Sequence, residues 1–156
     1  MEPAGYEISK RKATRTLIKA ISRTRDETIA LGEKLARRMK KGVVVALIGD
    51  LGAGKTVLVK GIAKGLGVTD TRYVNSPSFV IVKEHRGRIP LYHFDIYRLE
   101  GPASLETIGY DEYFYGNGVT IIEWADKIKG LLPKRHIEVR FSIRDDGSRE
   151  IKIKGL

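Results

Sequence analysis

The chain has 156 residues, which suits a single domain with a sizeable core. It contains no cysteine, which excludes disulfide bridges and thiolate metal sites, and no apolar stretch approaches the roughly 20 residues of a transmembrane helix. Because the N-terminus also lacks the apolar run of a signal peptide, we expect a cytoplasmic protein that does not engage a membrane. The formal net charge is +10. This charge can indicate affinity for RNA or for an acidic protein partner, or it can belong to a lysine-rich surface that is simply solvated.

The first part of the chain predicts an arm, a strand and a helix. Residues 1–14 carry clustered basic side chains without apolar periodicity, which predicts a mobile basic arm ahead of one domain at residues 15–156. Residues 16–22 have the composition of a strand, and the lysine within them favours a sheet edge. Thr24 followed by Glu27 forms a capping box, which predicts the start of a helix. The face of that helix that is expected to be buried comprises Thr28, Leu31, Leu35 and Met39.

A glycine loop at residues 49–56 has the sequence Gly-Asp-Leu-Gly-Ala-Gly-Lys-Thr. It fits the phosphate-loop pattern G-x-x-x-x-G-K-[ST] at every fixed position. Six apolar residues at 43–48 precede it and predict a buried parallel strand. Apolar residues at every fourth position from 58 to 66 predict a helix after it. The loop therefore lies between a strand and a helix, as the motif requires.

The residue types of this loop indicate that it binds a nucleoside triphosphate. Its glycines allow backbone conformations that a Cβ would block, so that successive N–H groups can converge on phosphate oxygens. Lys55 would reach the β- and γ-phosphates, and the Thr56 hydroxyl would bind Mg²⁺. The alternative, a glycine-rich turn that carries a lysine by chance, is less favoured because of the flanking strand and helix. The sequence lacks Asn-Lys-x-Asp, the usual guanine-selecting element, which favours ATP.

The rest of the chain adds hairpins to these parallel elements. We expect a polar loop at residues 74–79, one helix between residues 102 and 116, a strand at 119–122, a short helix at 127–132, and hairpins from 79–82 with 91–94 and from 137–143 with 150–153. This mixture favours an α/β fold: a P-loop NTPase-like three-layer sandwich with a mixed, mainly parallel sheet plus antiparallel hairpins.

Two of the predicted strands end in a carboxylate, Asp95 and Glu123. The carboxyl ends of strands face the crevice where open α/β sheets bind ligands. Either carboxylate can serve the metal while the other orients the attacking water, and each alone can instead cap a helix. Arg98 can stabilise the charge of the γ-phosphate or form an ion pair with a neighbouring carboxylate. Trp124 can stack on a base or a partner, or it can pack within the protein. The histidines lack metal-ligand spacing and are expected to be structural or solvent-facing: His85, His93 and His136.

Four blocks of sequence resemble the bacterial TsaE (YjeE) family. They are the glycine loop at 49–56, Ser-Pro-Ser-Phe at 76–79, Tyr-His-Phe-Asp-Ile-Tyr-Arg-Leu at 92–99 and Ile-Glu-Trp at 122–124. The last two blocks, in this order, are far more specific than the phosphate loop alone. The resemblance covers about residues 18–153, and it implies a small ATPase that helps to make N6-threonylcarbamoyladenosine in tRNA.

The resemblance also implies roles for individual residues. Those expected to contact the nucleotide are Gly49, Gly52, Ala53, Gly54, Lys55, Thr56, Val57, Arg149, Thr28 and Trp124. Those expected to take part in hydrolysis are Asp95, Glu123 and Lys55, with Mg²⁺ on Thr56 and Glu123. Those expected to form a switch read by a partner are Ser76, Pro77, Ser78, Tyr97 and Arg98.

The implied role is that of an accessory ATPase for the TsaD–TsaB pair, which meets tRNA indirectly or through the basic surface. Hydrolysis by the isolated chain should then be weak. Two other classes stay open on the residues alone. One is a small P-loop kinase that phosphorylates a nucleoside or metabolite hydroxyl, although little chain remains beyond Trp124 for a lid. The other is a nucleotide-regulated RNA-binding module.

Overall fold

The computed structural model describes residues 7–10, 16–75 and 81–156. The strands are Glu7–Lys10 (β1), Thr16–Ser22 (β2), Val44–Ile48 (β3), Val82–His85 (β4), Leu91–Asp95 (β5), Val119–Glu123 (β6), Ile137–Ile143 (β7) and Arg149–Lys154 (β8). The α-helices are Arg25–Ala36 (α1), Lys55–Gly65 (α2), Ala103–Thr107 (α3) and Tyr110–Phe114 (α4), and the 3₁₀ helices are Thr71–Tyr73 (η1) and Ala125–Leu131 (η2).

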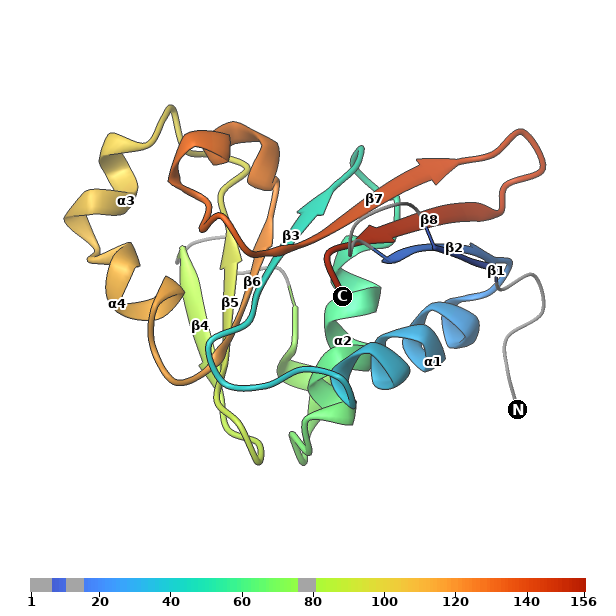
Figure 1. The fold of residues 1–156 in the computed structure, drawn as a ribbon, viewed down its shortest axis with the longest axis horizontal. Coiled ribbons are helices and arrows are strands. Elements are labelled where there is room, and N and C mark those ends of the chain that lie inside the picture. Colours follow the sequence, from blue (N-terminus) through green and yellow to red (C-terminus); the bar gives the residue numbers. More distant parts are fainter. Residues whose placement is uncertain (1–6, 11–15, 76–80) are drawn as a thin grey trace.

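All these strands belong to one mixed sheet in the order β1-β2-β8-β7-β3-β6-β5-β4 (Figure 1). Its centre is parallel, because β3 pairs in parallel with β7 and β6, and β6 pairs in parallel with β5. Antiparallel pairings lie on both sides of that centre and are the more numerous among the described strands. The predicted α/β fold with a mixed sheet and antiparallel hairpins is therefore confirmed, but among the described strands the sheet is not mainly parallel as expected.

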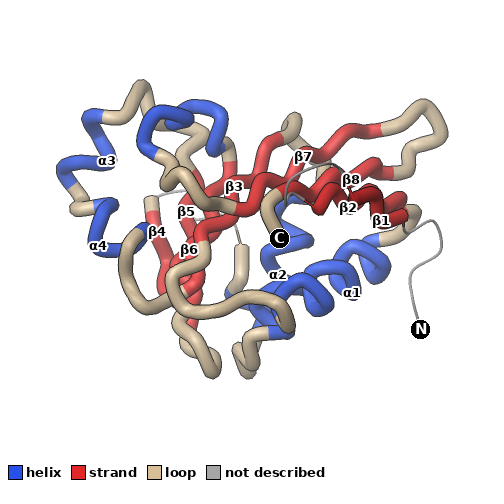
Figure 2. The backbone as a smooth tube through the Cα atoms, in the orientation of Figure 1, coloured by secondary structure: helices blue, strands red, loops and turns tan. Residues whose placement is uncertain are grey.

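Helices cover both faces of this sheet, which gives three layers (Figure 2). The two faces follow from the alternation of side chains along β3. Val45 and Leu47 belong to the apolar cluster that includes α1 and α2, whereas Val44 and Ala46 belong to the cluster that includes α3, α4 and η2. In the described parts of the chain, no helix has both the length and the apolar character that a bilayer crossing requires.

Helices α1 and α2 approach each other closely at two glycines. A Cβ added to Gly61 would lie 2.2 Å from the carbonyl oxygen of Ile29, and one added to Gly32 would lie 2.6 Å from that of Leu58. Both distances are shorter than real side chains allow, so only glycine permits this separation of the two backbones. The contact fixes α2, and with it the end of the glycine loop, against α1.

Several expectations about the elements differ from the structure; for example, the strand expected at 79–82 is β4 at Val82–His85, and the helix expected at 127–132 is the 3₁₀ helix η2 at Ala125–Leu131. Strand β2 is not at the edge, because β1, which lies within the segment expected to be an arm, pairs with it as Glu7 opposite Lys19. The single helix expected between residues 102 and 116 is two helices, because Gly109 adopts a left-handed conformation (φ +68°) that interrupts the α-helical backbone. Met39 is buried as expected, but it lies beyond the end of α1.

Candidate functional site

The glycine loop connects the carboxyl end of β3 to the first residue of α2. Gly52 (φ +79°) and Gly54 (φ +102°) both have left-handed backbones, which is why these positions need glycine. Gly54 is the N-cap of α2, so the loop ends where the free N–H groups and the positive dipole end of that helix begin. This arrangement suits an anion such as a phosphate group.

Lys55, the first residue of α2, turns its side chain back into the loop. Its Nζ donates hydrogen bonds to the carbonyl oxygens of Gly49 (2.5 Å) and Asp50 (2.8 Å). The ammonium also lies 4.2 Å from the centroid of the Trp124 ring, and the residue is only 5% exposed. Burial lowers the pKa of Lys55, and the negative charges around it, that of Glu123 foremost, oppose this shift. A cation is therefore held beside the loop in a largely dry environment.

Glu123, at the end of β6, connects the loop to the neighbouring strands. The Thr56 hydroxyl donates to its Oε1 (2.9 Å), and the Nε2 of His93 lies 2.5 Å from its Oε2. Both Glu123 and His93 are buried. Since an ionised Glu123 only accepts hydrogen bonds, Nε2 of His93 donates to it, and the buried Nδ1 of His93 has no partner among the described residues.

The sequence alone does not place His93 in the site. A structural or solvent-facing histidine is expected there, and the side chain is fully buried against Glu123, the carboxylate expected to bind the metal. The alternation of side chains along β5 could have indicated this position, because it places Leu91, His93 and Asp95 on one face of the strand. A polar residue at the middle position of this face requires a buried partner.

The second carboxylate, Asp95, reaches the same edge of the sheet through strand register. Asp95 pairs with Glu123 across β5 and β6, and Leu47 pairs with Glu123 across β3 and β6. The Oδ1 of Asp95 accepts a hydrogen bond from the backbone N–H of Tyr97 (3.0 Å). Both strand-end carboxylates therefore lie at the edge where the glycine loop begins.

The donor set at this edge fits a magnesium ion that is shared with a nucleotide. In the described ranges, no three histidine, aspartate or glutamate side chains gather into a ready-made cation site. Mg²⁺ in nucleotide sites takes only one or two protein oxygens and completes its shell with phosphates and water. The hydrogen-bonded oxygens of Thr56 and Glu123 supply that number.

An aromatic pair follows the two carboxylates. Trp124 is the one non-glycine residue with a positive φ (+64°) in the described segments, a conformation that costs roughly 1–2 kcal/mol. Its ring lies 4.8 Å from that of Tyr97, which is about half exposed. Lys127 donates to the carbonyl oxygen of Tyr97, and its ammonium lies 5.3 Å from the Tyr97 ring. Arg98 is exposed beside this pair.

A cavity of about 320 Å³ lies on the other side of the glycine loop. It is lined by Ser22, Arg23, Thr24, Arg25, Thr28, Gly52, Gly54, Val57, Gly147 and Arg149. Arg149, at the start of β8, donates to the carbonyl oxygens of Gly52 (3.1 Å) and Gly147 (2.5 Å), and so ties the closing hairpin to the loop. Thr28 and Ser22 share a hydrogen bond of 2.6 Å at the wall of the cavity. Five expected nucleotide contacts thus meet in one place: Thr28, Gly52, Gly54, Val57 and Arg149.

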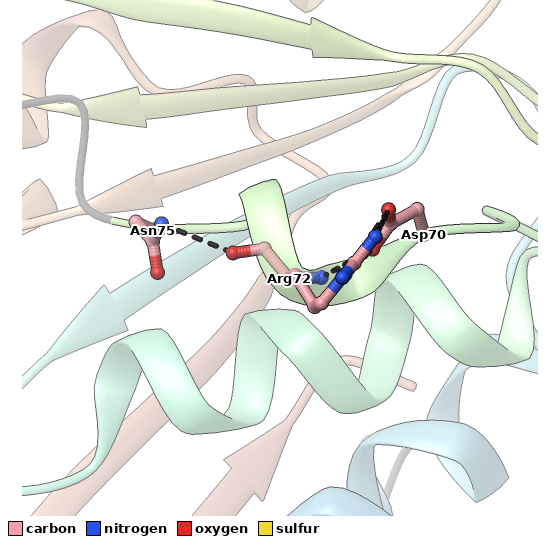
Figure 3. Close-up of polar contacts among 3 residues, drawn as sticks. All are labelled: Asp70, Arg72 and Asn75. Carbon is pink, nitrogen blue, oxygen red and sulfur yellow. Dashed lines mark hydrogen bonds and ion pairs between the residues drawn. The ribbon is translucent and has the colours of Figure 1, made fainter.

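The expected switch residues Ser76, Pro77 and Ser78 lie outside the described residues, but the segment that leads to them is described (Figure 3). The carboxylate of Asp70 accepts from the backbone N–H of Arg72 (3.0 Å) and from its guanidinium (2.7 and 2.9 Å). These bonds lower the pKa of Asp70 to about 2. The side-chain amide of Asn75 donates to the Arg72 carbonyl oxygen (3.1 Å). The chain is therefore held in place directly before residue 76.

Comparisons with known proteins give the family. The family model described as "Threonylcarbamoyl adenosine biosynthesis protein TsaE" matches residues 22–151. The tRNA threonylcarbamoyladenosine biosynthesis protein TsaE of Bacillus subtilis (strain 168) is 47% identical over 127 residues, which cover 81% of this chain and 78% of that protein. The protein of the same name from Treponema pallidum (strain Nichols) is 38% identical over 136 residues, which cover 87% of this chain and 99% of that protein.

A solved structure agrees with these relatives. The crystal structure of Bacillus subtilis YdiB is similar to this chain with a TM-score of 0.78 and 39% sequence identity, over 92% of this chain and 88% of that one. The match of the family model and the identity to curated relatives both extend over most of the chain. The chain belongs to the TsaE family.

Proposed function

We propose that this chain is an ATPase, dependent on Mg²⁺, that supports the formation of N6-threonylcarbamoyladenosine in tRNA. The observation that carries this proposal is the hydrogen bond from Thr56 of the glycine loop to the buried Glu123 of β6. It joins the residue that would bind both metal and phosphate to a strand-end carboxylate, as nucleotide hydrolysis needs. The names of the curated relatives support the link to tRNA threonylcarbamoyladenosine.

Each residue of the site has a part in this proposal. The N–H groups of the loop bind the phosphates, and Lys55 exchanges its loop carbonyl partners for β- and γ-phosphate oxygens. Thr56 and Glu123 would hold Mg²⁺, and the ion would supply positive charge next to the phosphates. Asp95, one strand further along the same edge, orients the attacking water.

The cavity beside the loop suits the nucleoside part of ATP. It is open to the loop through Gly52 and Gly54, and its wall includes Val57 of α2 and Thr28 of α1. Arg149 lies between this wall and the loop, where its guanidinium suits the phosphates and the sugar. The site would thus extend from Glu123 across the loop to α1.

The proposed partners are TsaD and TsaB, in the cytoplasm. The family's accessory role suits a chain whose own hydrolysis is weak and whose partner recognises Tyr97 and Arg98 according to the state of the γ-phosphate. The exposed aromatic ring of Tyr97, packed on Trp124 beside the Lys55 ammonium, gives a partner a surface that depends on the site. TsaD and TsaB would carry out the transfer to tRNA.

The test is repeated tRNA modification by purified TsaD–TsaB with ATP and Mg²⁺. Wild-type chain should raise the number of turnovers, Lys55→Ala should not, and Lys60→Ala on the same helix α2 should behave as wild type. Failure of the wild type to stimulate would contradict the proposal. Transfer of phosphate from ATP to a small-molecule hydroxyl would favour the kinase class instead.

A further inference from the structure

A second cavity, of about 400 Å³, lies at the end of the parallel strands opposite to the glycine loop. Its lining residues come from the segment that leads from α1 into β3, from the start of β7 and from the chain after β8. Figure 1 shows these segments. Four cationic side chains line it, and the remaining lining residues are His136, glycines and apolar residues. The four cations are Arg38, Lys40, Lys41 and Arg135.

These four cations lie around the cavity without ion-pair partners among the described residues. None of them makes an ion pair with another described residue, and all four are exposed. No acidic side chain is among the described residues that line the cavity. The neighbouring carboxylate, Glu138, is already held by Arg140 at 3.0 Å. Like charges around one cavity raise each other's energy, and an anion bound between them relieves that repulsion.

The backbone around the cavity is held in place by specific contacts. The N–H of Gly42 donates to the carbonyl oxygen of Gly118 (2.8 Å), which anchors the entry into β3. The Nδ1 of His136 lies 2.7 Å from the carbonyl oxygen of Pro133, which orients the imidazole. A Cβ on Gly155 would lie 2.4 Å from the carbonyl oxygen of His136, so the chain after β8 is packed against the opposite wall. The cations therefore surround a recess built on the sheet.

The chemistry of the lining favours phosphate groups of a nucleic-acid backbone. Arginine and lysine are donors only, and the described lining contains no Asn, Gln, Asp or Glu that would accept from a base edge. Such a set makes contacts that position a nucleic acid without reading its sequence. The cations come from two segments on either side of the recess, 38–41 and 135, which suits successive phosphates of one strand.

We infer that this cavity binds backbone phosphates of tRNA. The inference rests on the proposed function, which makes tRNA the RNA that this chain would meet. The site is separate from the nucleotide site, because the five residues of β3 extend over about 16 Å between them. ATP and RNA can therefore be bound at the same time.

The test compares two variants that lose the same charge. Lys40→Gln with Lys41→Gln alters the cavity, and Lys129→Gln with Arg144→Gln removes two exposed cations elsewhere. Binding of an unmodified tRNA transcript is measured by fluorescence anisotropy over a range of salt concentrations. The cavity variant should bind roughly tenfold more weakly near 0.1 M salt, and its plot of log affinity against log salt should be shallower by roughly 1–2. The control should stay near wild type, and both variants should melt and bind ATP as the wild type does.

Three outcomes would overturn the inference. Equal losses in the two variants would mean a general charge effect. Saturable binding of inorganic phosphate that the cavity variant loses, with tRNA affinity unchanged, would identify a small phosphate ligand. Loss of binding to a polyglutamate peptide, again with unchanged tRNA affinity, would identify an acidic protein segment. The proposed function fails separately, if wild-type chain does not stimulate tRNA modification.

Discussion

Replacement of His93 by leucine tests the buried pair that supports Glu123. The variant removes the 2.5 Å contact between Nε2 and Oε2 in a region without solvent access. A hydrogen bond to a charged group contributes about 1.5–3 kcal/mol, and loss of the unpartnered Nδ1 returns about 1 kcal/mol of that. The expected net loss is about 0.5–2 kcal/mol, which for a chain of this length lowers the Tm by about 1–8 °C.

The assay is urea unfolding together with the Mg²⁺ affinity of the complex with a non-hydrolysable ATP analogue. His93→Gln should recover most of the stability and the Mg²⁺ affinity, because its amide nitrogen lies near the position of Nε2. His93→Leu, Glu123→Gln and the double variant should give a coupling energy of at least about 1 kcal/mol. A leucine variant as stable as the wild type, with unchanged Mg²⁺ affinity, would refute the idea that His93 holds a charged Glu123.

Three further predictions address Glu123 of β6, the contact between α1 and α2, and the cavity beside the glycine loop. Glu123→Ala should lower hydrolysis of ATP roughly a hundredfold while the Kd for ATP changes much less, and equal turnover in a phosphate-release assay would remove Glu123 from the metal site. Gly61→Ala should destabilise the fold by about 1–3 kcal/mol in urea, because the new Cβ meets the Ile29 carbonyl oxygen, whereas Gly130→Ala, with open space around it, should be neutral. Arg149→Gln should raise the Kd for ATP about fivefold by calorimetry, and an unchanged Kd would place the nucleotide away from β8.

The strand, loop and helix around residues 49–56 could be predicted because their signals are local. An apolar run, a glycine pattern and a helical stripe each depend on residues close in sequence. The meeting of Asp95 and Glu123 at one edge could also be anticipated, since parallel strands bring their carboxyl ends together. In these cases the residues that give the sequence signal are the same residues that determine the local structure.

Features that depend on distant register could not be predicted. The contact of His93 with Glu123 arises from the pairing of β5 with β6, which no spacing within either strand encodes. The position of β2 inside the sheet depends on β1, a four-residue strand whose sequence carries too weak a signal by itself. The break at Gly109 was a matter of backbone conformation, since a glycine inside a helical pattern is compatible with either outcome.

The most direct test of the account is a calorimetric titration of ATP with Mg²⁺ into the wild type and Lys55→Ala. The ammonium of Lys55 is already held at the mouth of the loop by Gly49 and Asp50, so it needs only to change partners to bind phosphate. The account predicts a clear heat of binding for the wild type and a loss of at least about tenfold in affinity for Lys55→Ala, with an unchanged melting curve. Equal affinities in the two proteins would contradict it, because the phosphates would then lie elsewhere.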